Sequence, residues 1–234
     1  MKNKVFIIAE AGVNHNGSID IAKKLIDVAV SAGADAVKFQ TFKTESVVSR
    51  TAPKAQYQKE VARADESQFD MLKKLELDIN AHKKLLDYCL KKGIIFLSTP
   101  FDHESIDLLE SLDTPAYKVA SFEIVDLPLI KYIASRNKPI LMSTGMASFY
   151  EVGNAIESAR SAGNNRIALL HCISSYPAPI AEANLNMIQL LRDEFNVQVG
   201  LSDHTMGIGV PITAVSHGAV IIEKHFTLSR ADGG

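Results

Sequence analysis

Short apolar runs recur along the chain, and longer segments with helical spacing separate them. Each run is short enough to be a buried parallel strand, and each ends in polar or titratable residues. Eight stretches fit this description: 5–9, 36–39, 94–97, 117–120, 140–142, 167–170, 200–204 and 220–226. The pattern therefore predicts a repeated strand and helix alternation.

The segments between the runs carry apolar residues near helical spacing at 21–30, 81–90, 105–112 and 152–159. Helix starts are indicated by a capping box from Ser148 to Glu151 and by Asp102 as an N-cap. Glycines that suit the ends of helices stand before the next runs, at Gly33, Gly93, Gly163 and Gly218. Both kinds of signal support the alternation.

Eight strand and helix units favour an α/β fold, a (β/α)₈ TIM barrel, for which ~250 residues is typical. No glycine-rich dinucleotide fingerprint follows the first strand, which argues against an open doubly wound sheet. The pattern ends at Gly234 without an eighth helix. We therefore expect residues 1–234 to be the barrel domain, truncated after the eighth strand.

One connection departs from the pattern, because 43–78 separates the second run from the next convincing helix and is rich in Lys, Gln, Glu and Ser. A long insertion of this kind in a barrel is commonly a lid or a partner surface. An ordinary charged surface excursion explains it as well.

Composition places the chain among ordinary globular proteins, with 47% hydrophobic residues and a net charge of -2. Because the sequence has no blocks of basic residues, we do not expect nucleic acid as a partner. No apolar run approaches the ~18 residues of a membrane span, so no membrane-spanning segment is expected. We expect a cytoplasmic location. Cys89 and Cys172 lack a nearby partner and are expected to be reduced.

The active site of a barrel lies at the carboxyl ends of its strands, and those ends are strongly polar here. The polar residues there are Glu10, Lys38, Gln40, Ser98, Thr99, Lys118, Ser121, Glu123, Ser143, Thr144, His171, Ser174 and Tyr176. Two lysines with hydroxyl groups can bind a phosphate and a carboxylate, which favours a small polyanion as the ligand. Glu10 and Glu123 remain for proton transfer or for sugar hydroxyls.

The last two runs each finish on a histidine, His204 and His225. If these strands are parallel neighbours, the two imidazoles converge. A pair of imidazoles with open positions suits a divalent first-row metal, whereas either histidine alone could equally be a hydrogen-bonded core residue.

Seven motifs along nearly the whole chain resemble the sialic acid synthase family, which includes legionaminic and pseudaminic acid synthases. They are EAGVNHNG at 10–17, VKFQT at 37–41, STPF at 98–101, AYKVAS at 116–121, STGM at 143–146, GLSDH at 200–204 and EKHF at 223–226. The resemblance implies a transferase that condenses phosphoenolpyruvate with N-acetylmannosamine or a related acetamido sugar. The products would be a nine-carbon 2-keto acid and phosphate.

The resemblance also implies residue roles. Phosphoenolpyruvate would be bound by Lys38, Thr99, Lys118, Ser121, Ser143 and Ser202. The sugar would be held by Gln40, Glu123 and Tyr176. Glu10, His204 and His225 would be catalytic, with His204 and His225 binding Mn²⁺ or Mg²⁺. Ser174 departs from the asparagine that is common in the sialic acid enzymes, which leaves the identity of the sugar open.

The resemblance implies that family members continue into a small C-terminal antifreeze-like domain, which we expect this chain to lack, and that they are usually homodimers in their full-length form. Three alternatives stay open. The first, condensation of phosphoenolpyruvate with a phosphorylated aldose, needs a second phosphate clamp, whereas Arg136, Arg160 and Arg166 lie away from the strand ends. The second, a metal-dependent hydrolase, lacks its His-x-His motif. The third is a sugar-binding barrel without catalysis.

Overall fold

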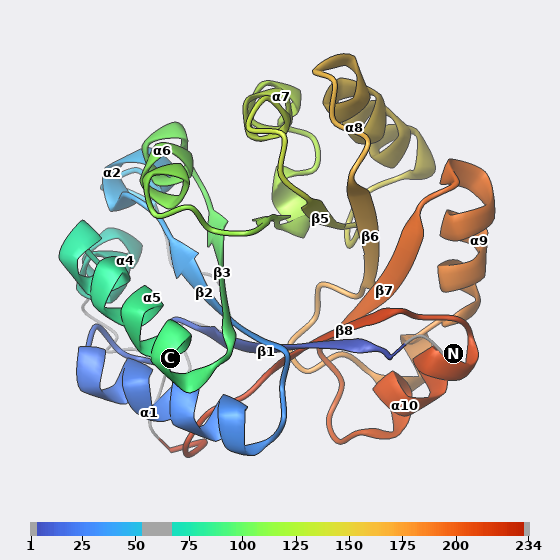
Figure 1. The fold of residues 1–234 in the computed structure, drawn as a ribbon. Helices are drawn as coiled ribbons and strands as arrows, with labels where there is room; N and C mark the ends of the chain where they lie inside the picture. The colour runs from blue at the N-terminus through green and yellow to red at the C-terminus, as the bar shows by residue number, and fades with distance from the viewer. Residues whose placement is uncertain (1–3, 53–66, 232–234) are drawn as a thin grey trace.

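The computed structural model describes residues 4–52 and 67–231. Its strands are β1 (Phe6–Gly12), β2 (Ala36–Thr41), β3 (Ile95–Pro100), β4 (Tyr117–Val119), β5 (Ile140–Ser143), β6 (Ile167–Cys172), β7 (Gln198–Asp203) and β8 (Ile221–His225). Its α-helices are α1 (Ile19–Ser31), α2 (Thr44–Val47), α4 (Gln68–Leu75), α5 (Ile79–Lys92), α6 (His103–Ser111), α7 (Leu127–Ala134), α8 (Phe149–Ser161), α9 (Asn186–Phe195) and α10 (Gly209–Ser216). Short 3₁₀ helices are η1 (Ser121–Glu123) and η2 (Ile180–Glu182). Figure 1 shows the helices as an outer ring around the strands.

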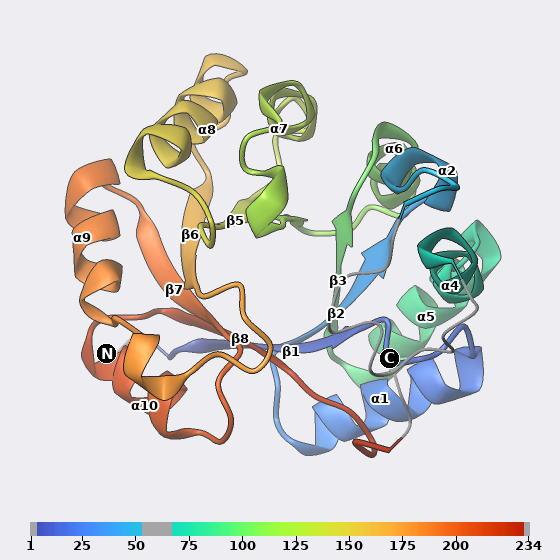
Figure 2. The ribbon, with the colours of Figure 1, turned by 180° about the vertical axis from the view of Figure 1, so that it is seen from behind.

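The eight strands are parallel, and they are hydrogen-bonded in the order β3-β2-β1-β8-β7-β6-β5-β4. Because the first and last strands of the chain pair with each other, the sheet closes into a barrel. A seam remains between β3 and β4, which no ladder joins among the described residues. The same arrangement is visible from behind in Figure 2. The predicted (β/α)₈ TIM barrel is confirmed.

The barrel interior is filled by one layer of apolar side chains, which we call the inner layer. It consists of Ile8, Ala36, Leu97, Leu141, Leu170 and Ile221, one from each of six strands. Gly200 occupies the same level of β7, where a Cβ would lie 2.8 Å from Cδ2 of Leu170 and 2.3 Å from the carbonyl oxygen of Ile221. Only glycine fits this position without displacing its neighbours.

A larger core lies between the outer faces of the strands and the helices. It forms because each helix turns its apolar stripe toward the barrel; α1, for example, buries Ala22, Leu25, Ile26 and Ala29. Each fully buried leucine or isoleucine contributes ~1.5 to 3 kcal/mol to folding. The predicted capping box of Ser148 and Glu151 and the Asp102 N-cap are both confirmed. None of the described helices has the length and apolarity that a membrane crossing needs.

In the described part of the long connection after β2, two helices occur that the sequence pattern does not predict, α2 and α4. A cluster around Glu76, which we call the Glu76 cluster, joins them to the barrel. The carboxylate of Glu76 accepts hydrogen bonds from Lys43 (2.9 Å), Lys73 (3.0 Å) and both N and Oγ1 of Thr44 (3.2 and 3.1 Å). The remainder of the connection, 53–66, lies outside the described residues.

Candidate active site

The residue two positions after each inner-layer residue points to the same side of its strand and forms the next level of the barrel. Ala116, which packs against the inner layer, and Gly200 precede two further members of this level in the same way. This level is polar at all but one position, and we call it the polar ring: Glu10, Lys38, Thr99, Lys118, Ser143, Cys172, Ser202 and Glu223. Every member is buried. Buried charges need partners or a ligand, so this level is the candidate active site.

Lys38 stands between two carboxylates of the polar ring. Its Nζ lies 2.7 Å from Oε2 of Glu10 and 3.8 Å from Oε2 of Glu223, and it donates a hydrogen bond to Oγ1 of Thr99 at 3.0 Å. Burial lowers the pKa of Lys38, but the two carboxylates outweigh this effect and raise it. The ammonium group is therefore charged.

Lys118 is the second ammonium group of the ring. Its Nζ donates to Oγ of Ser143 at 2.7 Å and lies 3.7 Å from Oε1 of Glu223, which also accepts a hydrogen bond from Ser202 at 3.0 Å. Burial lowers the pKa of Lys118. For Glu223, burial raises the pKa, but Lys118 and Lys38 outweigh it and the pKa is lowered.

Two carboxylates at the site, Glu10 and Glu123, have raised pKa values. Burial raises the pKa of Glu10, although Lys38 partly opposes this. Glu123, in η1, accepts a hydrogen bond from the backbone N–H of Ala120 at 2.8 Å, and burial raises its pKa to about 8. Glu123 is therefore protonated near neutral pH. Within residues 4–52 and 67–231, Oε1 of Glu123 and Oε2 of Glu223 are buried without a hydrogen-bond partner.

Gly145, in the loop after β5, leaves space for two hydroxyl groups at the mouth. A Cβ at this position would lie 2.5 Å from Oγ of Ser174 and 2.9 Å from Oγ of Ser121. Gly12 has a similar place in β1, where a Cβ would lie 3.3 Å from Oε1 of Glu10 and 3.7 Å from Nε2 of Gln40. The glycines keep the mouth open above the polar ring.

His204 and His225 converge as predicted, with ring centres 5.4 Å apart. Nδ1 of His204 lies 2.7 Å from the carbonyl oxygen of Ile173. A carbonyl only accepts, so Nδ1 carries a proton. Burial lowers the pKa of His204, but its contacts with Cys172 and Ile173 outweigh this and raise it, so Nε2 offers a lone pair only in the neutral form of the ring. Burial and then His204 lower the pKa of His225 to about 3, which keeps this imidazole neutral. The ring of Tyr176 lies 4.1 Å from that of His204.

This histidine pair fits a metal ion by its chemistry. Metal–imidazole bonds are ~2.1 Å long, so two rings at this separation can bind one ion between them once His204 has also lost its second proton. A ligating histidine usually donates its other N–H to a carbonyl or carboxylate, as His204 does. In the described part of the chain, no group of three or more His, Cys, Asp and Glu side chains could hold a metal. The remaining ligands would be water or substrate.

A cavity of about 540 Å³ opens beside the two histidines and is lined among others by Tyr176, Lys224 and Arg230. The three arginines considered from the sequence lie elsewhere. Arg136 pairs with Asp107, Arg160 donates to the carbonyl of Phe195, and Arg166 to Asn137. None of these contacts is at the polar ring.

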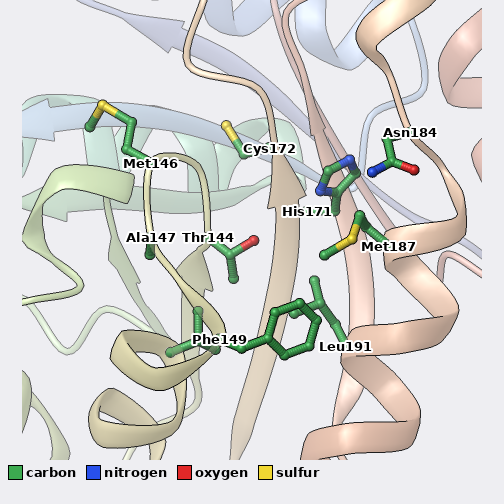
Figure 3. Close-up of a pocket in the computed structure, with 10 residues that line it drawn as sticks. Thr144, Met146, Ala147, Phe149, His171, Cys172, Asn184, Met187 and Leu191 are labelled. Carbon is green, nitrogen blue, oxygen red and sulfur yellow. The ribbon is translucent and has the colours of Figure 1, made fainter.

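The structure corrects the expectation for His171, which does not face the mouth. Its Nε2 lies 2.8 Å from the carbonyl oxygen of Ala183, and its side chain lines a cavity of about 220 Å³ with Asn184 and Met187. Figure 3 shows His171 and Cys172 leaving β6 on opposite sides. Ser98 likewise turns outward, to Thr41 at 2.7 Å.

Two members of the polar ring were not among the predicted site residues, Glu223 and Cys172. Glu223 could have been found, because it stands two residues before His225 and shares its face. Cys172, which is free as expected, lies with Sγ 3.8 Å from Nδ1 of His204. No sequence signal distinguished Cys172 from a core thiol. Thr144 also lies away from the mouth, because it lines the same outer cavity as His171.

Comparison with known proteins agrees with this geometry. The NeuB family model matches residues 25–234. The N,N'-diacetyllegionaminic acid synthase of Campylobacter jejuni is 51% identical over 99% of this chain and 70% of its own length. The pseudaminic acid synthase of Helicobacter pylori is 39% identical over 96% of this chain.

Among solved structures, the N-acetylneuraminic acid synthetase of Leptospira borgpetersenii in complex with citrate aligns with a TM-score of 0.88 and 36% identity, over 97% of this chain and 75% of that one. The chain spans 65% of the length of a second legionaminic acid synthase, from Legionella pneumophila, and 66% of the H. pylori protein. The sequence motifs, the barrel and these matches agree, and the chain belongs to the NeuB family of sialic acid synthases.

Proposed function

We propose that this barrel condenses phosphoenolpyruvate with an acetamido sugar aldehyde to give a nine-carbon 2-keto sugar acid and phosphate. The observation that carries the proposal is the pair of buried lysines, Lys38 and Lys118, each hydrogen-bonded to a hydroxyl group of the polar ring. Two ammonium groups at one level of a barrel suit a ligand with two separate anionic groups. The relative that was crystallised with citrate, another polyanion, supports this reading.

Phosphoenolpyruvate would take the place that Glu10 and Glu223 now occupy around the lysines. Its phosphate and carboxylate would be shared between Lys38 with Thr99 and Lys118 with Ser143, and Ser121 and Ser202 would add hydroxyl donors. Because the lysines already have carboxylate partners, the substrate must compete with these glutamates for the ammonium groups.

The sugar would lie above this level, in contact with Gln40, Glu123 and Tyr176. Two relatives, at 51% and 47% identity, are named for N,N'-diacetyllegionaminic acid, a product with two acetylated amino groups. We therefore propose a diacetamido sugar as the preferred substrate. The cavity of about 540 Å³ borders this place at Tyr176 and at the two histidines.

His204 and His225 would bind Mn²⁺ or Mg²⁺, which supplies a Lewis acid for the sugar aldehyde. In the reaction, C3 of phosphoenolpyruvate attacks the aldehyde carbon and forms the new C–C bond. Water then adds to C2, and phosphate leaves as the C2–O bond breaks. Glu10, which the substrate displaces from Lys38, would accept a proton from that water. Glu123, protonated near neutral pH, would donate to a sugar oxygen.

Phosphate release tests the proposal. The protein is incubated with phosphoenolpyruvate and one sugar at a time. The three sugars are a diacetamido hexose, N-acetylmannosamine and a phosphorylated aldose. Fastest release with the diacetamido hexose is expected. Binding of sugar without phosphate release in any arm would indicate a non-catalytic barrel, and preference for the phosphorylated aldose would indicate the sibling reaction.

Bridging ¹⁸O in phosphoenolpyruvate tests the order of bond breaking. Cleavage of the C2–O bond sends the label into phosphate, which mass spectrometry detects. Label retained in the keto acid would contradict this route.

A further inference from the structure

An ion pair joins the tips of β7 and β8 on the side away from the polar ring. Nζ of Lys224 lies 2.5 Å from Oδ2 of Asp203, and the two residues are register partners in the ladder. The same Nζ donates to the carbonyl oxygen of Thr205 at 2.6 Å. Oδ1 of Asp203 accepts from N (3.0 Å) and Oγ1 (2.8 Å) of Thr205. We call these three residues the Asp203 clamp.

The Asp203 clamp stands next to both histidines of the candidate metal site. Asp203 precedes His204 and Lys224 precedes His225, so each pair of neighbours points to opposite sides of its strand. The Asp203 side chain is 1% exposed, and both of its oxygens have donors. Because this carboxylate is buried and both of its oxygens accept hydrogen bonds, its ion pair with Lys224 differs from an exposed surface salt bridge.

The position of the clamp matters because the β7–β8 ladder ends there. The last paired residues of the two strands are Asp203 and Lys224. His204 lies one step beyond this pair, and the separation of its ring from that of His225 therefore depends on how the two strand tips are held. The clamp is the side-chain link at that point.

Thr205 extends the clamp to a third segment. It forms a backbone bridge with Ala178, whose N–H donates to the carbonyl oxygen of His204 at 2.9 Å. Ala178 is two residues after Tyr176, whose ring lies against His204. The backbone on both sides of His204 is thus held by one connected set of contacts.

We infer that the Asp203 clamp is a positioning device that sets the geometry of His204 and His225 for a divalent metal ion. The inference rests on the metal site of the proposed function. Outer groups that hydrogen-bond to metal ligands typically change metal affinity by 10- to 100-fold when they are replaced. We take the same range for the clamp, which holds the strand ends that carry the two histidines. If the clamp only held β7 and β8 together, its replacement would lower stability without selectively lowering the affinity for the metal.

Lys138 provides the matched control. Its Nζ pairs with Asp113 at 2.9 Å and Glu110 at 3.2 Å, and its side chain is 17% exposed against 29% for Lys224. It precedes β5 and so lies at the opposite end of the barrel. Lys138→Met removes a similar ion pair far from the histidines.

The experiment compares the unaltered protein, Lys224→Met, Lys224→Arg and Lys138→Met. Mn²⁺ affinity is measured by calorimetry, phosphoenolpyruvate affinity in the presence of a chelator, and melting temperature by calorimetric scanning. Lys224→Met is expected to weaken Mn²⁺ binding about 10- to 100-fold. Its phosphoenolpyruvate affinity should stay near that of the unaltered protein, Lys224→Arg should recover part of the loss, and Lys138→Met should bind Mn²⁺ normally.

Equal Mn²⁺ affinity in Lys224→Met and Lys138→Met would show that the clamp only holds the two strands together, and it would overturn the inference. Absence of Mn²⁺ binding by the unaltered protein would also overturn it, while phosphate release would still decide the proposed function separately. If Lys224→Met fails to fold, Thr205→Val is used, which removes one donor to Asp203 and keeps the ion pair. A several-fold loss of Mn²⁺ affinity is expected there, and no loss would contradict the clamp.

Discussion

The polar ring and the Glu76 cluster take their charged groups from the same two residue types, lysine and glutamate, but these groups are satisfied to different degrees. At Glu76 both carboxylate oxygens have donors, and although burial raises its pKa, Lys43 and Lys73 outweigh this and lower it to about 2. In the mouth, burial raises the pKa of Glu10, and one oxygen of Glu223 is left without a hydrogen bond in the described chain.

The difference separates a cluster that stabilises from one that binds. A carboxylate with every lone pair occupied holds elements together and has nothing left for a ligand. Partly satisfied charges at a barrel mouth cost stability, and proteins retain such groups where a ligand completes them. Substitutions in the two clusters should therefore affect different measurements.

The largest effect is expected from His225→Ala above the polar ring. Loss of one of the two proposed metal-binding imidazoles should reduce turnover to background, with little change in melting temperature. Phosphate release, metal content and thermal scanning check this. His217→Ala, on the outer side after α10, is the control and should keep full activity. Normal turnover in His225→Ala would remove the metal site from the proposal.

Lys118→Met tests the comparison directly. Loss of a charge-assisted contact typically costs ~1.5 to 3 kcal/mol, so phosphoenolpyruvate should bind about tenfold to a hundredfold more weakly. The matched variant is Lys43→Met, which should lower the free energy of unfolding and leave this affinity unchanged. Calorimetric titration and denaturant unfolding of both variants provide the measurements. Similar losses in both would show that the two clusters do not differ in role.

Gly145→Ala tests the shape of the mouth. Its methyl group would displace the hydroxyls of Ser174 and Ser121, and a lost hydrogen bond of ~1 kcal/mol corresponds to roughly fivefold weaker phosphoenolpyruvate binding. Gly209→Ala is the control, because a Cβ there meets nothing within 4 Å. Unchanged affinity in Gly145→Ala would place the substrate away from these two hydroxyls.

The smallest effect on substrate binding is expected at the other end of the comparison, from Glu76→Gln, which should change stability alone. Its folded pKa of about 2 lies below the unfolded value of 4.5, so its contribution is complete above about pH 4.5 and is lost as the pH falls toward 2. Allowing for solvent screening, the contribution is about 1 to 2 kcal/mol. Urea unfolding at pH 7 and pH 3 should show a smaller difference between the two proteins at pH 3. An equal difference at both would contradict the assigned pKa.

The sequence predicts the barrel well because strands and helices differ in period, and the mouth residues follow from the rule that strand ends face the site. The prediction from sequence fails where the spacing of apolar residues does not distinguish the two faces of a strand or does not mark a helix. The run 167–172 is apolar on both faces, so it does not reveal that His171 turns outward and Cys172 inward. Helices α2 and α4 were missed because α2 has only four residues and both lie in a polar stretch.

The seam between β3 and β4 bears on how the barrel opens in solution. Strands β1 and β8 are paired on both sides, whereas β3 and β4 each have one paired neighbour within residues 4–52 and 67–231. Backbone amides that lack a ladder partner lose their protons to solvent through smaller fluctuations than those inside a sheet. Deuterium should therefore enter the facing edges of β3 and β4 first. Because β3 carries Thr99 and β4 carries Lys118, a bound anion that bridges these side chains would slow that exchange, and the seam would report occupancy of the site.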